Sequence, residues 1–141
     1  VLPPGGSTTA NLYVKGKRNS HLSITAMLLP TNDGFVGLNA ANIPNEHGRY
    51  TYYLNGYDAG TEANDEVING GGAPGVPGIP ADPGENNGKG ASGAAEEDNN
   101  TTVHIHRGIL GDNQPNGGKS DLDKGVHRWL NPVAQVVVTV R

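Results

Sequence analysis

The chain ends in the stretch Ala134-Gln135-Val136-Val137-Val138-Thr139-Val140, in which apolar and polar residues alternate almost without a break. Successive side chains of a β-strand point to opposite faces of its sheet. The period of two therefore predicts a half-buried strand with Ala134, Val136, Val138 and Val140 on one face. Only Val137 departs from the pattern.

The same period appears near the start of the chain. Leu22, Ile24, Ala26 and Leu28 alternate with polar or small neighbours, and the shorter stretch from Leu12 to Val14 does the same. The polar residues 17–20 between these two stretches are typical of a turn. We therefore expect residues 12–28 to form a hairpin.

Two further strands are predicted between residues 35 and 55. Phe35–Leu38 forms a short strand and Tyr50–Asn55 a longer one, because aromatic and β-branched residues favour extended backbone. Residues 39–48 are predicted to be a loop. Apolar residues nowhere recur with helical spacing over a dozen positions. The sequence thus predicts an all-β fold, an antiparallel β-sandwich of at least six strands.

Residues 69–100 interrupt this pattern with a stretch rich in glycine and proline. Its glycines and prolines repeat locally every three residues, but Ala81 and Asn87 break the period, which excludes a collagen helix. An extended surface loop outside the core is expected instead. The predicted organisation is a flexible N-terminal segment, 1–9, followed by one domain, 10–141, that carries this loop as an insertion.

Composition excludes several classes of protein. The 141 residues have a formal net charge of −4 and no long basic cluster, which disfavours a nucleic-acid partner. The chain has no cysteine, and no apolar run is long enough to span a bilayer. It begins at Val1 without a basic or apolar leader, which is typical of a mature exported protein whose signal was removed. We therefore expect a secreted or cell-surface location.

Acidic and amide side chains gather in two turns, each at the end of a predicted strand. Calcium takes six to eight oxygen ligands from such loops, whereas isolated Asp and Asn residues often only close turns. The spacing does not match an EF-hand. The candidate ligands are Asn32 and Asp33 in the first turn and Asp58, Glu62, Asn64 and Asp65 in the second.

Four segments resemble the spondin N-terminal domain, in particular its bacterial members. They are Pro30-Thr31-Asn32-Asp33-Gly34-Phe35-Val36-Gly37-Leu38, Tyr57-Asp58-Ala59-Gly60-Thr61-Glu62-Ala63-Asn64-Asp65, Val103-His104-Ile105-His106-Arg107-Gly108-Ile109 and Arg128-Trp129-Leu130-Asn131-Pro132-Val133-Ala134. The resemblance implies a C2-like sandwich that binds Ca2+ through Asp33, Asp58 and the acid at position 62. It also implies a role in adhesion and extracellular-matrix contacts. Glu62 stands where animal members carry Asp.

Other side chains are weaker candidates for a ligand or interface site. His104 and His106 are expected on one face of a strand, where they could share a transition metal with a third ligand or be outward polar residues. Tyr53 and Tyr57 lie close to the second acidic turn and could stack on a sugar or pack in the core. A second acidic stretch, with Asp112 and residues 121–125, has alternating carboxylates and a glycine that weakly indicate a cation site, but it is expected to form solvated turns.

No nucleophile elbow, phosphate loop or metalloenzyme spacing is present in the sequence. The expected function is therefore a non-enzymatic, calcium-binding structural or adhesive module, which assembles with itself or contacts extracellular-matrix or cell-surface components. The alternative is a calcium-dependent binder of surface glycans or anionic lipid headgroups. A small hydrolase built on the histidines is a third, weaker hypothesis.

Overall fold

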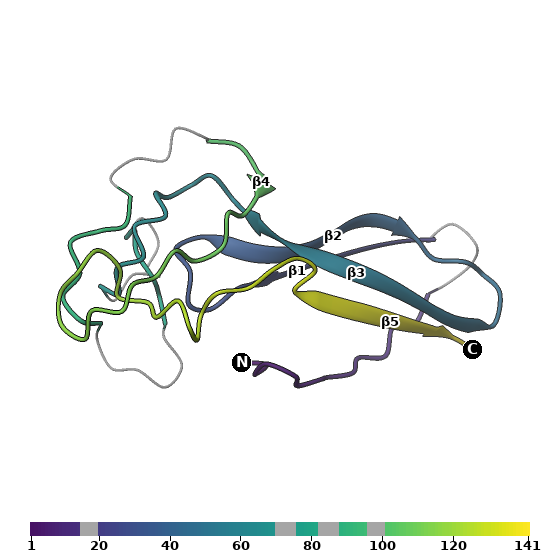
Figure 1. Ribbon diagram of the computed structural model, residues 1–141. Coiled ribbons are helices and arrows are strands. Elements are labelled where there is room, and N and C mark those ends of the chain that lie inside the picture. Colours follow the sequence, from purple (N-terminus) through teal and green to yellow (C-terminus); the bar gives the residue numbers. More distant parts are fainter. Residues whose placement is uncertain (15–19, 70–75, 82–87, 96–100) are drawn as a thin grey trace.

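The protein is built from β-strands and loops. The computed structural model describes residues 1–14, 20–69, 76–81, 88–95 and 101–141, and this part of the chain contains five strands and no helix (Figure 1). The strands are β1 (His21–Met27), β2 (Gly34–Asn42), β3 (Gly48–Asp58), β4 (His104–Ile105) and β5 (Ala134–Val140). Accordingly, no helix among the described residues could cross a membrane.

Strand β3 connects the whole sheet. Its C-terminal residues, Asn55–Asp58, pair with Gly34–Gly37 of β2, which in turn pairs with β1. Its last two residues also pair with β4, while its N-terminal part, 48–54, pairs with β5. All of these pairings between strands are antiparallel. The prediction of an all-β antiparallel fold is confirmed.

One face of the sheet is apolar. Tyr50, Tyr52 and Leu54 stand directly opposite Val138, Val136 and Ala134 across the β3–β5 ladder, and therefore share a face. Leu54 is nonetheless the only apolar strand side chain that is fully buried in the described part of the chain, at 2% exposure. Tyr50, Tyr52 and the valines opposite them are only half-buried.

The compact core lies instead in a second part of the molecule, at the left of Figure 1. We call this part the loop lobe; its described residues are 59–69, 76–81, 88–95 and 101–133. Ile79, Ile109 and Leu122 form its buried cluster, with Ile68 and Trp129 packed against them. The lobe has little regular structure, so other contacts must hold its backbone.

The described strands confirm part of the predicted pattern. The strands predicted at 22–28, 35–38, 50–55 and 134–140 are present, but β2 runs on to Asn42, so the first part of the predicted loop 39–48 is wrong. Five strands are present in the described residues, fewer than the six expected.

The prediction of a strand at Leu12 to Val14 is also wrong. This stretch is extended coil, with Leu12 exposed by 70% and Val14 by 57%. Most of the turn that was expected to follow it falls on residues 15–19, outside the described residues.

The glycine- and proline-rich segment does not lie wholly outside the core. Ile79, in its middle, is 0% exposed and belongs to the cluster of the loop lobe. The expectation of a simple surface loop is therefore wrong at Gly78 and Ile79, which are buried, whereas residues 76, 77 and 81 are exposed. Residues 70–75, 82–87 and 96–100 of this segment lie outside the described residues.

Candidate cation site at one end of the sheet

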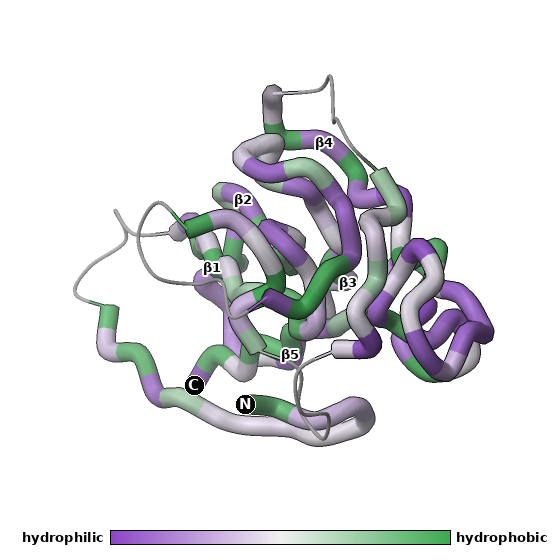
Figure 2. The backbone as a smooth tube through the Cα atoms, turned by 90° about the vertical axis from the view of Figure 1, so that its left-hand side faces the viewer, coloured by the Kyte–Doolittle hydropathy of each residue, from purple (hydrophilic) through white to green (hydrophobic). Residues whose placement is uncertain are grey.

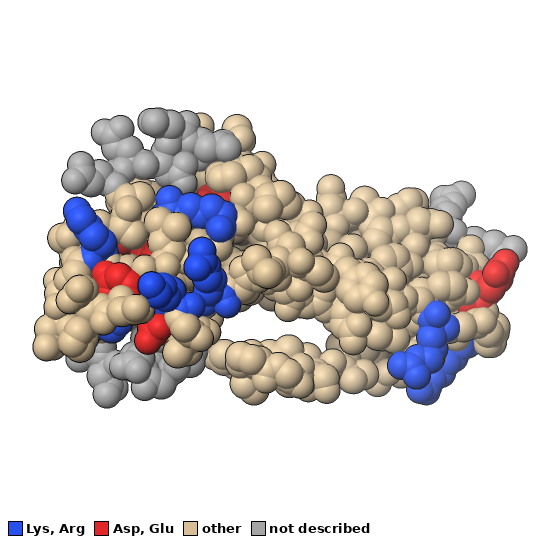
Figure 3. All heavy atoms as spheres, viewed as in Figure 1, with Lys and Arg blue, Asp and Glu red and all other residues tan. Residues whose placement is uncertain are grey.

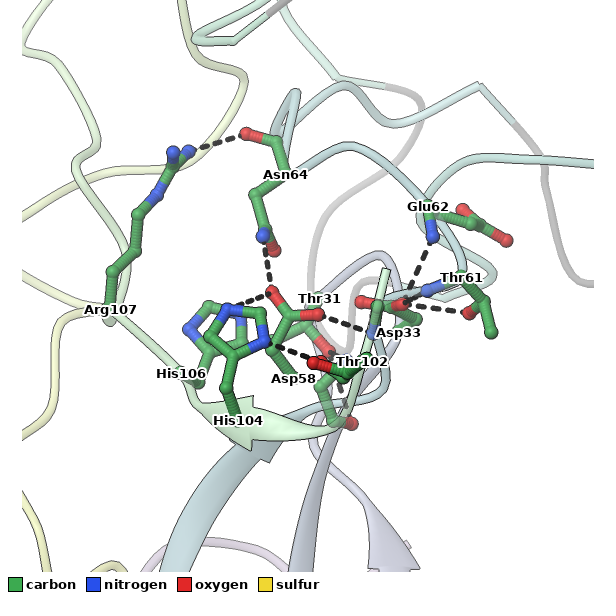
Figure 4. A network of polar contacts seen from close by, with 12 residues as sticks. Thr31, Asp33, Asp58, Thr61, Glu62, Asn64, Thr102, His104, His106 and Arg107 are labelled. Atoms are coloured by element: carbon green, nitrogen blue, oxygen red, sulfur yellow. Dashed lines mark hydrogen bonds and ion pairs between the residues drawn. The ribbon is translucent and has the colours of Figure 1, made fainter. Parts of the chain in front are cut away.

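Asp33 and Asp58 are brought together by strand register. Asp33 directly precedes β2, Asp58 ends β3, and Gly34 stands opposite Asp58 in the ladder. The turn before Asp33 is closed by Thr31, whose hydroxyl donates to the Leu28 carbonyl at 2.6 Å and accepts from the Gly34 amide at 2.9 Å. Both carboxylates therefore lie where the sheet meets the loop lobe (Figure 4).

Asp33 holds the loop that follows β3. Its Oδ2 accepts hydrogen bonds from the Thr61 amide and hydroxyl, both at 2.7 Å, and from the Glu62 amide at 3.0 Å. Its Oδ1 is buried and has no hydrogen-bond partner among the described residues. A buried carboxylate oxygen that lacks a partner carries a desolvation cost, which a ligand bound to this oxygen would offset.

Asp58 is completely buried, and each of its two carboxylate oxygens accepts a hydrogen bond. Its Oδ1 accepts the Gly60 amide at 2.7 Å, and its Oδ2 accepts the Asn64 side-chain amide. His104 Nε2 lies 3.8 Å from the same Oδ2. Gly60 has a φ of +71°, and a Cβ there would meet the backbone of residue 101 at 2.7 Å, so the turn requires glycine.

The remaining predicted ligands also bind loop backbone or one another. Glu62 Oε2 accepts the amide of Gly78 at 2.7 Å, which ties this acidic turn to the glycine-rich segment. Asn32 donates its side-chain amide to Asp65 Oδ1 at 2.7 Å, and the same oxygen accepts the Val67 amide at 3.0 Å. These side chains thus close turns, whatever else they bind.

The predicted ligand set forms linked pairs and not one compact sphere. Asp33 is joined to the loop of Glu62, Asn32 to Asp65, and Asp58 to Asn64. Within the described ranges, no three His, Asp or Glu side chains converge as a group that could hold a metal ion. One oxygen of the set, Asp33 Oδ1, is left without a hydrogen-bond partner among the described residues, and a carboxylate oxygen is a ligand that hard cations such as calcium take.

An open cavity of about 680 Å³ lies beside Asp33. Asn32, Asp33, Thr61 and Glu62 supply its polar side. The apolar lining comes from β1, β2 and the glycine- and proline-rich segment, namely Met27, Phe35, Val76, Pro77 and Pro80. A ligand with one polar and one apolar side would match this lining.

His106 is not an outward polar residue, and that expectation is wrong. It is only 4% exposed, its Nδ1 accepts the Gly108 amide at 2.9 Å, and its ring lies 5.0 Å from that of Trp129. Its Nε2 is buried and unpartnered in the described part of the chain. Burial lowers the pKa of His106 below its ordinary value, and the nearby Asp58 carboxylate opposes this shift.

The other candidate side chains differ in their surroundings. His104 is half-buried in β4, and its Nδ1 lies 2.8 Å from the Thr102 carbonyl. The ring of Tyr57 stacks on Phe35 with centroids 5.6 Å apart, which gives Tyr57 a packing role. Tyr53 is 68% exposed, on the opposite face of β3 from Leu54, and remains accessible to a partner.

Two carboxylates of the loop lobe are buried against expectation: sequence reasoning missed Glu66 and misjudged the exposure of Asp121. Glu66 is 2% exposed and accepts the amides of Leu110 at 2.7 Å and Gly111 at 2.9 Å, together with the Ser120 hydroxyl. Asp121, expected to be solvated, is 4% exposed and accepts three backbone amides, those of Ile68, Lys89 and Ala91. The burial of both residues was not predicted, because acidic side chains are rarely buried.

Asp112 also organises backbone, at the surface of the lobe. Its carboxylate accepts the amides of Gln114, Lys119 and Ser120. These hydrogen bonds, the one from Ser120 foremost, lower the pKa of Asp112. In the loop lobe, carboxylate-to-amide hydrogen bonds thus add to scattered backbone–backbone hydrogen bonds, such as those from Ser92 to Gly118 and from Asp121 to Glu66.

Arg107 was missed as well. Its guanidinium donates to the Asn64 carbonyl at 2.6 Å, so it supports the loop that carries an Asp58 partner (Figure 4).

Compared with protein-family models, curated proteins and solved structures, the chain matches none of them.

Proposed function

We propose that this protein is a non-enzymatic, calcium-binding module of the extracellular space with a structural or adhesive role, built as a C2-like β-sandwich. The observation that supports it best is the buried Oδ1 of Asp33, which has no partner in the described part of the chain. The oxygen belongs to a carboxylate that already holds the neighbouring acidic turn. A cation there would join the end of the sheet to the loop lobe.

Calcium fits this position better than a smaller cation. It tolerates irregular oxygen shells, and extracellular modules that bind it weakly are filled at the calcium concentrations outside cells. The proposed ligands are Asp33, Asp58 and Glu62, with Asn32 and Asp65 supporting the turns. The two oxygens of Asp58 already accept hydrogen bonds, so Asp58 would contribute its charge and a remaining lone pair.

The carboxylates are placed for structure more than for proton transfer. Asp33 and Asp58 direct three of their four oxygens at donors of the protein itself. A general acid or base needs an oxygen within reach of a substrate proton. This arrangement supports a non-catalytic role.

Thermal unfolding with calcium or with a chelator tests the proposal. Ligand at 100 times its Kd stabilises a protein by about 2.7 kcal/mol, so calcium should raise the Tm of the native chain by several degrees. Asp33→Asn and Asp58→Asn should each abolish most of that rise. Both variants should also melt below the native chain in chelator, because each removes a charged acceptor of the protein's own hydrogen bonds. The quantity to compare is therefore each variant's own Tm difference between calcium and chelator. Asp112→Asn, a turn carboxylate remote from Asp33 in sequence, is the matched control and should keep the full response. Identical melting of the native chain in calcium and chelator would refute the proposal.

The cavity favours a second candidate function, a calcium-dependent binder of glycans or anionic lipid headgroups. Asp33 and Glu62 line it together with Phe35 and Met27, so a cation held at Asp33 could bridge to an anionic or hydroxyl ligand over an apolar wall. Saturable binding to phosphatidylserine vesicles or a glycan array, lost in chelator and in Met27→Asp, would identify this function. If the protein binds calcium but neither the vesicles nor any glycan, the structural role is favoured.

A further inference from the structure

The edge of β5 is open and unprotected. Of the described strands, only β3 pairs with β5, and the ladder runs from Gly48–Val140 to Leu54–Ala134 without a register shift. The strand contains no charged residue and no proline. Natural proteins usually protect such an edge with charge, proline or a bulge, because its unpaired amides and carbonyls accept another strand.

The apolar face of β5 also lacks a cover. Val136 and Val138 are only half-buried, and Val137 on the other face is 41% exposed. In Figure 3 the charged side chains lie over the loop lobe and at the opposite tip of the molecule, and the middle of the side shown carries no charge. An added strand with apolar residues at alternate positions would complete this surface.

The chain carries a segment with this alternating pattern in its N-terminal arm, residues 1–14, which is extended coil in the single chain. Ala10, Leu12 and Val14 alternate with Asn11 and Tyr13, and Leu12, Tyr13 and Val14 are exposed by 70%, 95% and 57%. Within the described residues, the arm's backbone makes one hydrogen bond, from the Gly6 amide to the Pro3 carbonyl. Figures 1 and 2 both show the arm running beneath β5 without joining the sheet.

We propose that residues 10–14 of one copy add as a strand to the open edge of β5 in a second copy. Leu12 and Val14 then cover the half-buried valines, and the arm's backbone pairs with that of β5. A second copy is the occupant because the arm of the same chain stands off this edge, while every copy presents both the arm and the edge. Such a contact is heterologous and produces open chains or closed rings, according to its rotation.

This inference rests on the proposed function, because strand addition would serve the structural or adhesive role proposed above. The contact itself requires no cation. Sedimentation velocity of the full chain over a hundredfold concentration range, in calcium and in chelator, separates the two ideas. Assembly that persists in chelator supports strand addition even if calcium binding fails. A native chain that is monomeric throughout overturns strand addition and leaves the cation proposal intact.

Variants of the arm test the donated strand. Leu12→Asp should weaken association by about tenfold or more. Leu2→Asp changes an equally accessible apolar residue outside the strand and should assemble normally. Removal of residues 1–14 should give a monomer that a peptide of residues 8–14 binds. Assembly that survives both Leu12→Asp and this deletion would overturn the proposal and point to pairing of two β5 edges.

Variants of β5 test the accepting edge. Val137→Lys places a charge on the edge strand while leaving the opposite face intact, and should weaken association as strongly as Leu12→Asp. Thr51→Lys is the matched control, because Thr51 is exposed and stands opposite Val137 on β3, one strand away from the edge. Equal assembly of the two lysine variants would overturn the assignment to β5. Circular dichroism verifies that each variant is folded.

Discussion

Glu66→Gln tests whether carboxylate-to-amide hydrogen bonds hold the loop lobe. Glu66 is buried, and its Oε1 accepts one amide hydrogen bond while its Oε2 accepts an amide and a hydroxyl. A glutamine has nearly the same size but offers only one acceptor oxygen. If that oxygen takes the position of Oε2, the glutamine NH2 faces the Leu110 amide, and two donors confront each other.

The expected cost follows from these contacts. A hydrogen bond to a charged group contributes about 1.5–3 kcal/mol, and a buried donor left without an acceptor costs about 1–3 kcal/mol. Glu66→Gln should therefore lower the free energy of unfolding by about 2–4 kcal/mol. For a chain of this size, such a loss lowers the Tm by roughly 10 °C.

Urea unfolding followed by circular dichroism measures this loss directly. Glu46→Gln is the matched control, because Glu46 is exposed and the hydrogen bond recorded at this residue uses its main-chain carbonyl. Its unfolding free energy should change by less than about 0.5 kcal/mol. If the two variants were equally stable, the acidic side chains of the lobe would be solvated turn residues and the reasoning would fail.

Two further predictions concern the core and pH. Ile79→Ala should destabilise the protein by about 2–4 kcal/mol, because Ile79 is fully buried against Ile109 and Leu122. Val76→Ala, at an exposed neighbouring position, is the control and should change the unfolding free energy little in the same urea titration. Since burial lowers the pKa of His106, the unfolded chain binds a proton more readily than the folded one, and stability should fall as the pH drops below about 6.5. His106→Asn keeps an acceptor for the Gly108 amide and should reduce the difference between the Tm at pH 8 and the Tm at pH 5. If the variant shows the same difference as the native chain, the loss of stability at acid pH comes from other groups.

Sequence alone predicted the regular part of the fold well. Alternation places the strands around Leu22–Leu28 and Ala134–Val140 correctly, because period two is a property of each segment by itself. The same signal failed at Leu12 to Val14. These residues carry a strand pattern but pair with no other described segment of the chain, and a strand forms only where a ladder can bond it.

The loop lobe shows why the site was harder to predict. Asp33 and Asp58 were found because each lies at the end of a strand, and register brings strand ends together. Glu66 was not found and Asp121 was wrongly expected to be solvated, since their roles depend on which distant backbone amides the fold leaves unpaired. Ile79 was missed for a similar reason, because its glycine and proline neighbours carry no periodic signal.

The buried acids of the loop lobe also bear on the speed and order of folding. Glu66 joins Ser120 across 54 residues of sequence, and Asp121 joins Ile68 across 53, whereas β1, β2 and β3 follow one another as adjacent hairpins. Contacts between distant residues form late, because the intervening chain must lose entropy before they bring any gain. The hairpins should therefore form in an early kinetic phase and the loop lobe in a slower one. An intermediate with folded hairpins and an unfolded lobe would expose the uncharged residues of β5 to other chains.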